Sequence, residues 1–478
     1  VDSDMTTALA ANQGPDIVYG SGPSFVMPLV EAGKLEPMDK YAEQYGWKDK
    51  ILQPYYESGT VNGSLYSLVN GVSTMGVFYN KKVLEDNGWK VPTTMKELEN
   101  TMDQALQKGL YASVTGNKGW QPVNENYASL FLTHIAGPET VYNVLTGKEK
   151  WNNPNMKAAI EKSKEWWDKG YLAGDDYVNL NFSESLQLLA DEKSPFFIGP
   201  TIAFQWAASF FTGDKAENLG FIPFPATEQV PNETYTLGAA CTLSINANKS
   251  QEHKDEAAKI INKMMTPEFM QDMTTAWPGY WGTPLKDLSS VDTSSMSYLS
   301  KSFVEVVQKI AKAVDEGNFG YYDNVFFPAA TQQRIVNIDE VWFDTTSVSA
   351  YLDTLDKKVL KIDAGVKTDN IHAWAKFKFN WQGWGLTEPP STYTVSFDFR
   401  SDTVLDTYEP SNPNTTAVNY VLWRDANNNI EDRVGPKYGL VQMGNRIRNN
   451  GGVYLEVSDL SRWHNYSFEI NGRQFNFF

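Results

Sequence analysis

The chain has 478 residues, of which 41 are Lys or Arg and 58 are Asp or Glu, for a formal net charge of −17. A chain of this length exceeds one ordinary hydrophobic core, and its 41% hydrophobic and 21% charged residues exclude wholesale disorder. The acidity disfavours nucleic acid or an anionic membrane surface as a partner, because both would repel the chain.

Residues 1–365 alternate short apolar runs with amphipathic helical patterns. Apolar residues recur every three to four positions at 257–265 and 303–314, which predicts helices with one buried stripe. Thr94 with Glu97 predicts a capping box, and Thr266 followed by Pro267 predicts a helix start. The predicted strands between the helices are 17–19, 76–79, 195–198 and 221–223. This alternation predicts an α/β fold.

The composition changes near residue 366. Residues 1–365 contain 30 basic and 46 acidic residues, a net charge of −16, whereas residues 366–478 contain 11 and 12, a net charge of −1. Side chains alternate with period two over 393–400, and Asn471-Gly472 joins two apolar runs as in a β-hairpin. Further strand candidates are 373–379, 418–424, 438–442 and 453–457. We therefore predict an antiparallel, all-β sandwich over 366–478.

Seven segments of the first part follow one another in a characteristic order: 14–18, 31–38, 76–81, 91–98, 197–200, 219–225 and 257–269. In this order they resemble extracellular solute-binding proteins of bacterial ABC sugar importers, which have a maltose-binding-protein-like fold. The resemblance implies a two-lobe type II periplasmic-binding-protein fold, with a hinge crossing near Tyr79-Asn80-Lys81. Its first lobe is predicted at about 1–77 and 238–300, and its second at about 78–237 and 301–365.

The second part resembles concanavalin-like lectin and glucanase sandwiches more loosely. The segments that carry this resemblance are 393–400, 418–423, 438–442 and 463–472. The solute-binding family opens with a strand, a helix and a second strand ahead of its Gly-Pro-Asp segment, here Gly14-Pro15-Asp16. This chain has no such elements there, and its β-module ends directly after a hairpin strand. We therefore expect both modules to be incomplete in this sequence.

Candidate ligand-binding residues follow from the chemistry of sugars, which present apolar C–H faces and hydroxyl groups. A site needs flat aromatic side chains and a few fixed polar groups in a cleft. By the resemblance, Trp206 follows the Gly199-Pro200 turn, where family members place a stacking aromatic. The turn at Ser21 could offer backbone amides, although a plain helix start explains it equally well. The other candidates are Trp120, Tyr127, Trp277, Tyr280, Trp281, Tyr322 and Asp323.

A structural role competes with each of these assignments. A single Trp in a chain of this size is more often part of the core than a ligand platform. For Trp277 and Trp281 the balance shifts toward ligand contact, because they flank Pro278-Gly279 in a loop, and loops rarely bury such area without a partner.

Other chemistries find no support in the sequence. Cys241 is the sole cysteine, which excludes intrachain disulfides, and the four His residues are isolated, which disfavours a transition-metal site. No phosphate-binding loop or nucleophile elbow is present, so we expect no cofactor. The acidic loop 425–432 could hold a structural calcium ion in the β-sandwich, although a solvated loop is the simpler interpretation. Residues 1–4 do not begin a secretion signal, and no run is long enough to span a membrane.

These observations predict a non-catalytic carbohydrate receptor whose two lobes close on an oligosaccharide and dock with an ABC transporter permease. We expect a monomeric extracellular or periplasmic protein, held at the cell surface by an anchor outside this chain, as in a lipoprotein. One alternative is a glycosidase or lyase, which needs two carboxylates across a glycosidic bond. The glucanase pattern Glu-x-Asp-x-x-Glu is missing, and 456–459 is its nearest approach. Another alternative is an adhesion protein that tethers the chain to glycan.

Overall fold

A computed structural model describes residues 2–356 and, beyond them, the strands β12 to β18. The chain divides into two compact units, Val1–Lys361 and Ile362–Phe478. The predicted strand at 373–379 and the acidic loop 425–432 lie outside the described residues.

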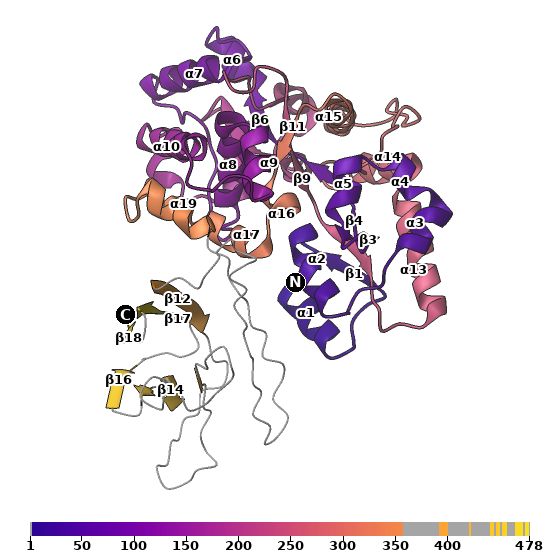
Figure 1. Ribbon diagram of the computed structural model, residues 1–478. Helices are drawn as coiled ribbons and strands as arrows, with labels where there is room; N and C mark the ends of the chain where they lie inside the picture. Colours follow the sequence, from indigo (N-terminus) through magenta and orange to yellow (C-terminus); the bar gives the residue numbers. More distant parts are fainter. Residues whose placement is uncertain are drawn as a thin grey trace. The chain divides into compact units, whose positions relative to one another are not determined.

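The first lobe of unit 1 is built on two three-stranded sheets, ordered β1-β10-β4 and β11-β9-β5 (Figure 1). Their strands are β1 Ile17–Gly20, β4 Leu68–Val69, β5 Val72–Ser73, β9 Tyr235–Ala239, β10 Thr242–Ile245 and β11 Phe319–Tyr321, beside the hairpin of β2 Thr60–Val61 and β3 Ser64–Leu65. The helices here are α1 Asp2–Ala10, α2 Pro23–Glu31, α3 Asp39–Tyr45, α4 Trp47–Lys50, α5 Gln53–Ser58, α13 Gln251–Met264 and α14 Pro267–Ala276.

The second lobe is built on an antiparallel sheet ordered β7-β6-β8, made of β6 Met75–Asn80, β7 Phe196–Pro200 and β8 Leu219–Pro223. Its helices include α6 Lys81–Asp86, α7 Met95–Gln107, α8 Val123–Phe131, α9 Pro138–Leu145, α10 Pro154–Asp168, α11 Phe182–Ala190, α12 Phe204–Ala207, α17 Ala329–Ile335, α18 Asp339–Trp342 and α19 Val348–Asp356. Short turns of other helix types lie at η1 Leu132–Ala136, η2 Gly174–Asp176, η3 Thr201–Ala203, η4 Gly213–Asn218 and η5 Val336–Ile338.

Helix starts follow the local chemistry of the sequence. Thr94 and Glu97 form the predicted capping box at α7. Thr266 is the N-cap of α14, directly before Pro267, and its hydroxyl accepts a hydrogen bond from the backbone N–H of Phe269. These side chains satisfy backbone donors that a helix start leaves without partners. The strands predicted within 1–365 also form, as β1, β6, β7 and β8. An α/β architecture is therefore confirmed for this unit.

The sheet of the second lobe is buried on both faces. Along β6, Phe78 packs with Phe197 and Phe221 in one core, while Val77 lies in the other core with Ile198. Adjacent strand residues point to opposite faces, so one strand supplies both cores. The first core continues into α15 Tyr298–Asp315, where Phe303 meets Phe204 with ring centroids 5.7 Å apart. The apolar stripe of this helix packs in a core that holds residues of both lobes, and the lobe boundary predicted between residues 300 and 301 stays a prediction.

The chain crosses between the lobes at a few short segments. It passes from β5 to β6 at Thr74, a few residues ahead of the crossing predicted at Tyr79-Asn80-Lys81; there Asn80 instead caps α6 through the backbone N–H of Val83. A later crossing is α16 Asp323–Phe326, which follows β11 and contacts α2, α5 and β9 as well as α8. Figure 1 shows α16 in the middle of the unit, between the helices of the two lobes.

Unit 2 is described through its strands alone. β12 Thr392–Phe399, β17 His464–Asn471 and β18 Gln474–Phe477 form one antiparallel sheet, in which Asn471 pairs with Gln474 across the predicted hairpin. A second antiparallel sheet contains β13 Tyr420–Val421, β14 Leu440–Met443, β15 Arg446–Asn449 and β16 Gly452–Glu456. β15 was not predicted from the sequence. The sandwich itself stays a prediction.

Candidate functional site

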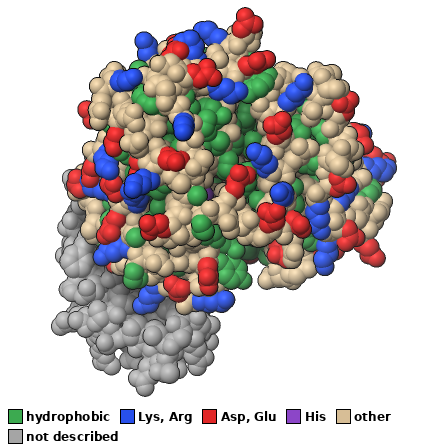
Figure 2. All heavy atoms as spheres, turned by 90° about the horizontal axis from the view of Figure 1, so that it is seen from above, with side chains coloured by type: hydrophobic (Ala, Val, Ile, Leu, Met, Phe, Trp, Pro, Cys, Tyr) green, Lys and Arg blue, Asp and Glu red, His purple; other side chains and the backbone are tan. Residues whose placement is uncertain are grey.

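Three of the predicted tryptophans reach the surface. The exposed fractions are 44% for Trp120, 38% for Trp206 and 43% for Trp277, whereas Trp281 is half-buried. Indole rings lose favourable burial when they stay in water, so exposed rings are candidates for contact with a partner. In Figure 2 apolar side chains reach the surface of one face among scattered charged groups of both signs.

One group of rings joins Trp120 and Trp206 through Phe182, and we call it the Trp206 group. The Phe182 ring centroid lies 6.0 Å from that of Trp120 and 5.1 Å from that of Trp206, both in edge-on geometry. Phe182 begins α11 directly after Asn181, whose side chain forms a capping box with Glu184. The capped helix start therefore fixes the ring that supports two exposed indoles.

A second group contains Trp277, Tyr280 and Trp281, and we call it the Trp277 group. Trp277 and Tyr280 are stacked, with centroids 5.3 Å apart and planes 16° apart, and Trp281 meets Tyr280 edge-on at 5.3 Å. The Tyr280 hydroxyl lies 2.9 Å from the Cys241 Sγ, and burial raises the pKa of this phenol to about 12. Tyr280 therefore stays neutral and packs against both indoles.

Gly279 seats the Trp277 group against the chain segment that carries Trp206. Its φ is +106°, and a Cβ built on it would lie 2.8 Å from the backbone N of Gln205 and 3.1 Å from the carbonyl O of Ile202. Only glycine combines this backbone conformation with so close an approach. The two groups of rings, which come from segments about 70 positions apart in the sequence, therefore lie on adjoining pieces of backbone.

Ser21, Tyr322 and Asp323 come together around α16. The Asn324 side chain donates to the carbonyl O of Ala239 at 2.9 Å and to that of Ser21 at 3.5 Å. Gly22 leaves no room for a Cβ, which would lie 2.2 Å from the Asn324 carbonyl O. The crossing helix α16 is therefore fixed to the loop after β1, and the role of Ser21, Tyr322 and Asp323 as ligand contacts stays a prediction.

The carboxyl group of Asp323 is buried beside polar side chains of α8. The Ser129 hydroxyl donates to Asp323 Oδ1 and accepts the Asp323 backbone N–H, each at 3.1 Å. The Tyr322 hydroxyl donates to Asn126 Oδ1. Burial raises the pKa of Asp323, and burial together with the Asp323 charge raises that of Glu125 well above its usual range. This polar cluster joins α8 of the second lobe to the crossing.

Tyr127 occupies a different environment from the other candidates. It is fully buried in the second core, and its hydroxyl donates to the Ile198 carbonyl O at 3.1 Å. Burial raises the pKa of its phenol above the usual range. Tyr127, Tyr322 and Asp323 are thus closed to solvent in this conformation, while Trp120, Trp206 and Trp277 are open to it.

Sequence reasoning missed Phe182, Glu125, Asn126 and Ser129 as parts of these groups. The start of α11 could have been read from Asn181 and Glu184, which have capping-box spacing. That signal places Phe182 at a helix start but gives no hint of its neighbours. For Ser129 and Asp323, 194 positions apart, no local signal exists.

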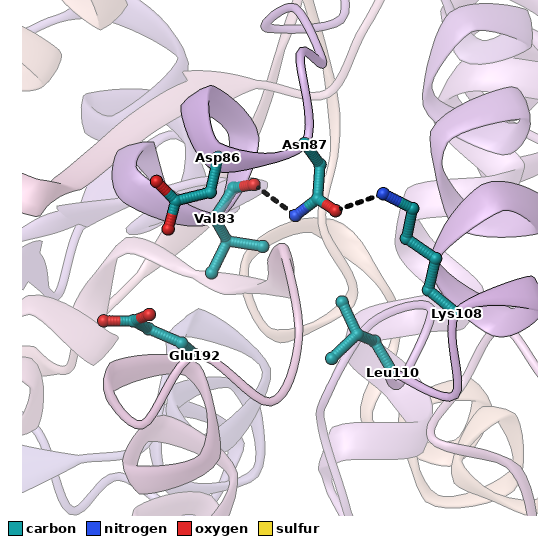
Figure 3. Close-up of a pocket in the computed structure, with 6 residues that line it drawn as sticks. All are labelled: Val83, Asp86, Asn87, Lys108, Leu110 and Glu192. Atoms are coloured by element: carbon teal, nitrogen blue, oxygen red, sulfur yellow. Dashed lines mark hydrogen bonds between the residues drawn. The ribbon is translucent and has the colours of Figure 1, made fainter.

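Two hollows in the described residues lie away from both groups of rings. One, of about 280 Å³, is lined by Val83, Asp86, Asn87, Lys108, Leu110 and Glu192 (Figure 3). There Lys108 donates to Asn87 Oδ1 at 2.6 Å and Asn87 to the Val83 carbonyl O at 2.8 Å, so the polar groups satisfy one another. The other, of about 470 Å³, lies between β1 and α13, beside Ile260, which is 49% exposed although its pattern predicted burial.

The described residues hold no group of three or more His, Cys, Asp or Glu side chains arranged to bind a metal ion. In the same part of the chain, every helix is too short or too polar to cross a membrane.

The family described as "Bacterial extracellular solute-binding protein" matches residues 2–298.

Curated relatives are similar over part of their length. The chain is 24% identical over 226 residues to the "Multiple sugar-binding protein" of Streptococcus mutans, which covers 45% of this chain and 51% of that protein. It is 27% identical over 156 residues to the "Diacetylchitobiose binding protein NgcE" of Streptomyces coelicolor, covering 31% and 32%. The matched part therefore spans about half of the first relative and a third of the second.

Solved structures give the fold. A "Chitin oligosaccharide binding protein" superposes with a TM-score of 0.63 at 18% identity, over 74% of this chain and 85% of that chain. A structure from work on xylan utilization by Caldanaerobius polysaccharolyticus gives 0.63 at 20% identity, over 74% and 88%. A maltose-bound MalE3 of T. maritima gives 0.58 at 16% identity, over 74% and 86%. Unit 1 therefore has the two-lobe α/β periplasmic-binding-protein fold.

Proposed function

The chain belongs to the bacterial extracellular solute-binding proteins, and we propose that its first unit binds a neutral oligosaccharide and delivers it to the permease of an ABC transporter. The names of the curated relatives, which refer to sugars and diacetylchitobiose, support this proposal. The observation that carries it is the pair of adjoining aromatic groups: exposed Trp206 and Trp277 stand on segments that Gly279 holds together.

The chemistry of the two groups fits a sugar without charge. Stacked Trp277 and Tyr280 offer a flat face, and the Trp206 group offers indoles held by edge-on contact with Phe182. Sugar C–H faces bind to such rings, and the hydroxyls need a few polar partners. Ser21, Asn126 and Asp323 would supply these when the lobes open and close around the ligand, because they line the crossing between the lobes.

The remaining assignments complete the proposal. The protein is non-catalytic and acts outside the cell as a monomer, held at the surface by an anchor beyond residues 1–478. Unit 2 is a lectin-like β-sandwich that adds a glycan contact. The antiparallel pairing of its strands supports an all-β module of this kind.

Calorimetric titration of the full chain with a panel of sugars tests the proposal. The panel contains diacetylchitobiose, longer chitin oligosaccharides, xylo-oligosaccharides and maltose. We expect reversible binding of one class without release of shorter products. Binding of none, or the appearance of cleavage products, would refute the receptor function.

Substitutions of the exposed indoles locate the site. Trp206→Ala and Trp277→Ala should each lower the affinity about tenfold, because one aromatic contact contributes about 1.5 kcal/mol. Phe343→Ala is the matched control: it removes an aromatic ring that is 43% exposed and belongs to neither group. Equal effects of all three variants would mean that the rings are not the platform.

A further inference from the structure

Two carboxyl groups meet where α16 crosses between the lobes. Glu125 stands on α8 of the second lobe, and Asp323 begins α16, which contacts α2, α5 and β9 of the first lobe. Asp323 has no exposed surface. The contact therefore joins one lobe to the segment that is anchored on the other.

The hydrogen bonds around Asp323 leave one oxygen without a donor. Its Oδ1 accepts from the Ser129 hydroxyl at 3.1 Å, but within residues 2–356 no donor reaches its buried Oδ2 in hydrogen-bonding geometry. The carboxyl group of Glu125 interacts with that of Asp323 at hydrogen-bond range. Two ionised carboxylates offer acceptors alone, so this contact is a hydrogen bond when a proton lies between them.

Within the described part of unit 1, no cationic side chain is among the groups that interact with the two carboxyls. The amide of Gln332 on α17 lies beside both carboxyls, and Arg334 of the same helix donates instead to the Thr354 carbonyl O at 3.0 Å. The charged residues of α2 and α5 are the acidic Glu31 and Glu57, and β9 carries none. The other titratable groups that face the pair are the phenols of Tyr322 and Tyr351, with Asp339 and Glu340 beyond Tyr351.

We infer that Glu125 and Asp323 share one proton in the folded protein and that its loss loosens the contact of α8 with the crossing. When the proton leaves to solvent, two negative charges remain side by side, that of Asp323 without exposed surface and that of Glu125 partly buried, and they repel each other. The directions of the shifts agree, because burial raises the pKa of both carboxyls and the neighbouring Asp323 charge raises that of Glu125 further. The role of this loosening in sugar release rests on the proposed function.

Infrared spectroscopy of the full chain at pH 8 tests the shared proton. We expect a carbonyl band of a protonated carboxylic acid in the wild type. It should be absent in Glu125→Gln, because the new amide donates to Asp323 and lets it ionise. Glu228→Gln, a change at an exposed residue, is the matched control and should keep the band. A wild-type spectrum without the band, or one that Glu125→Gln leaves unchanged, would overturn the inference.

Denaturant unfolding and hydrogen exchange test the loosening. Between pH 7 and 9 the folding equilibrium constant of the wild type should fall with rising pH, because the folded state alone holds the proton. Relative to Glu125→Gln, we expect an additional decrease of up to about tenfold per pH unit. Protection of the Asp323 amide, bonded to Ser129 Oγ, should fall in parallel. Equal pH profiles for the two proteins would contradict the inference. Neither measurement uses a sugar, so a failure of this inference can be distinguished from a failure of the proposed function.

Discussion

Gly279→Ala tests how the two aromatic groups are held together. The added Cβ would lie 2.8 Å from the backbone N of Gln205, and the residue would keep a φ of +106°. A left-handed backbone costs a non-glycine residue about 1–2 kcal/mol, and overpacking against a backbone atom costs about 1–3 kcal/mol. We therefore expect a loss of about 2–5 kcal/mol in the free energy of unfolding.

A second glycine separates strain from contact. Gly63 has a φ of +87° in the turn between β2 and β3, and no heavy atom lies within 4 Å of its built Cβ. Gly63→Ala should therefore lose about 1–2 kcal/mol from backbone strain alone. Urea unfolding of both variants gives the difference, which measures the contact between the loop of the Trp277 group and Gln205.

Sugar affinity gives the functional side of the same comparison. If the Trp277 group is seated by Gly279, Gly279→Ala should weaken sugar binding while Gly63→Ala leaves it unchanged. The reasoning is refuted if Gly279→Ala destabilises the protein no more than Gly63→Ala does. It is also refuted if a clear loss of stability comes with unchanged affinity, because the loop position would then not matter to the ligand.

Three further predictions concern stability. Thr94→Ala should lower the free energy of unfolding by about 1 kcal/mol, because the Glu97 backbone N–H loses its cap. Hydrogen bonds from Thr93 lower the pKa of Glu97 in the folded protein. The contribution of ionised Glu97 to stability is therefore present above its unfolded-state pKa and is lost as pH falls through its folded-state pKa. In denaturant unfolding at acidic pH, Glu97→Gln should weaken this loss of stability. Tyr127→Phe should lose about 1 kcal/mol in the same assay, because the buried Ile198 carbonyl loses its donor, and unchanged stability would contradict this account.

The sequence predicts features whose cause is local. The capping box at Thr94, the start of α14 at Thr266 and the hairpin at Asn471 all form, because a few neighbouring residues decide them. Exposure is less local: Ile260 fits the apolar stripe of α13 but is 49% exposed, since burial depends on what packs against the helix. The same limit applies to the candidate rings, of which Tyr127 is buried in the core and Trp120 is open to solvent.

The contacts that matter most for the proposed site join residues far apart in the sequence. Ser129 meets Asp323 across 194 positions, and Asn324 meets Ser21 across 303. Gly22 permits the second contact, since a Cβ there would strike the Asn324 carbonyl, as Gly279 permits the approach to Gln205. Both glycines lie next to candidate ligand residues, Ser21 and Tyr280. A larger residue at either position would separate two backbone segments, so Gly22 determines how closely the loop after β1 approaches α16, and Gly279 determines how closely the two aromatic groups approach each other.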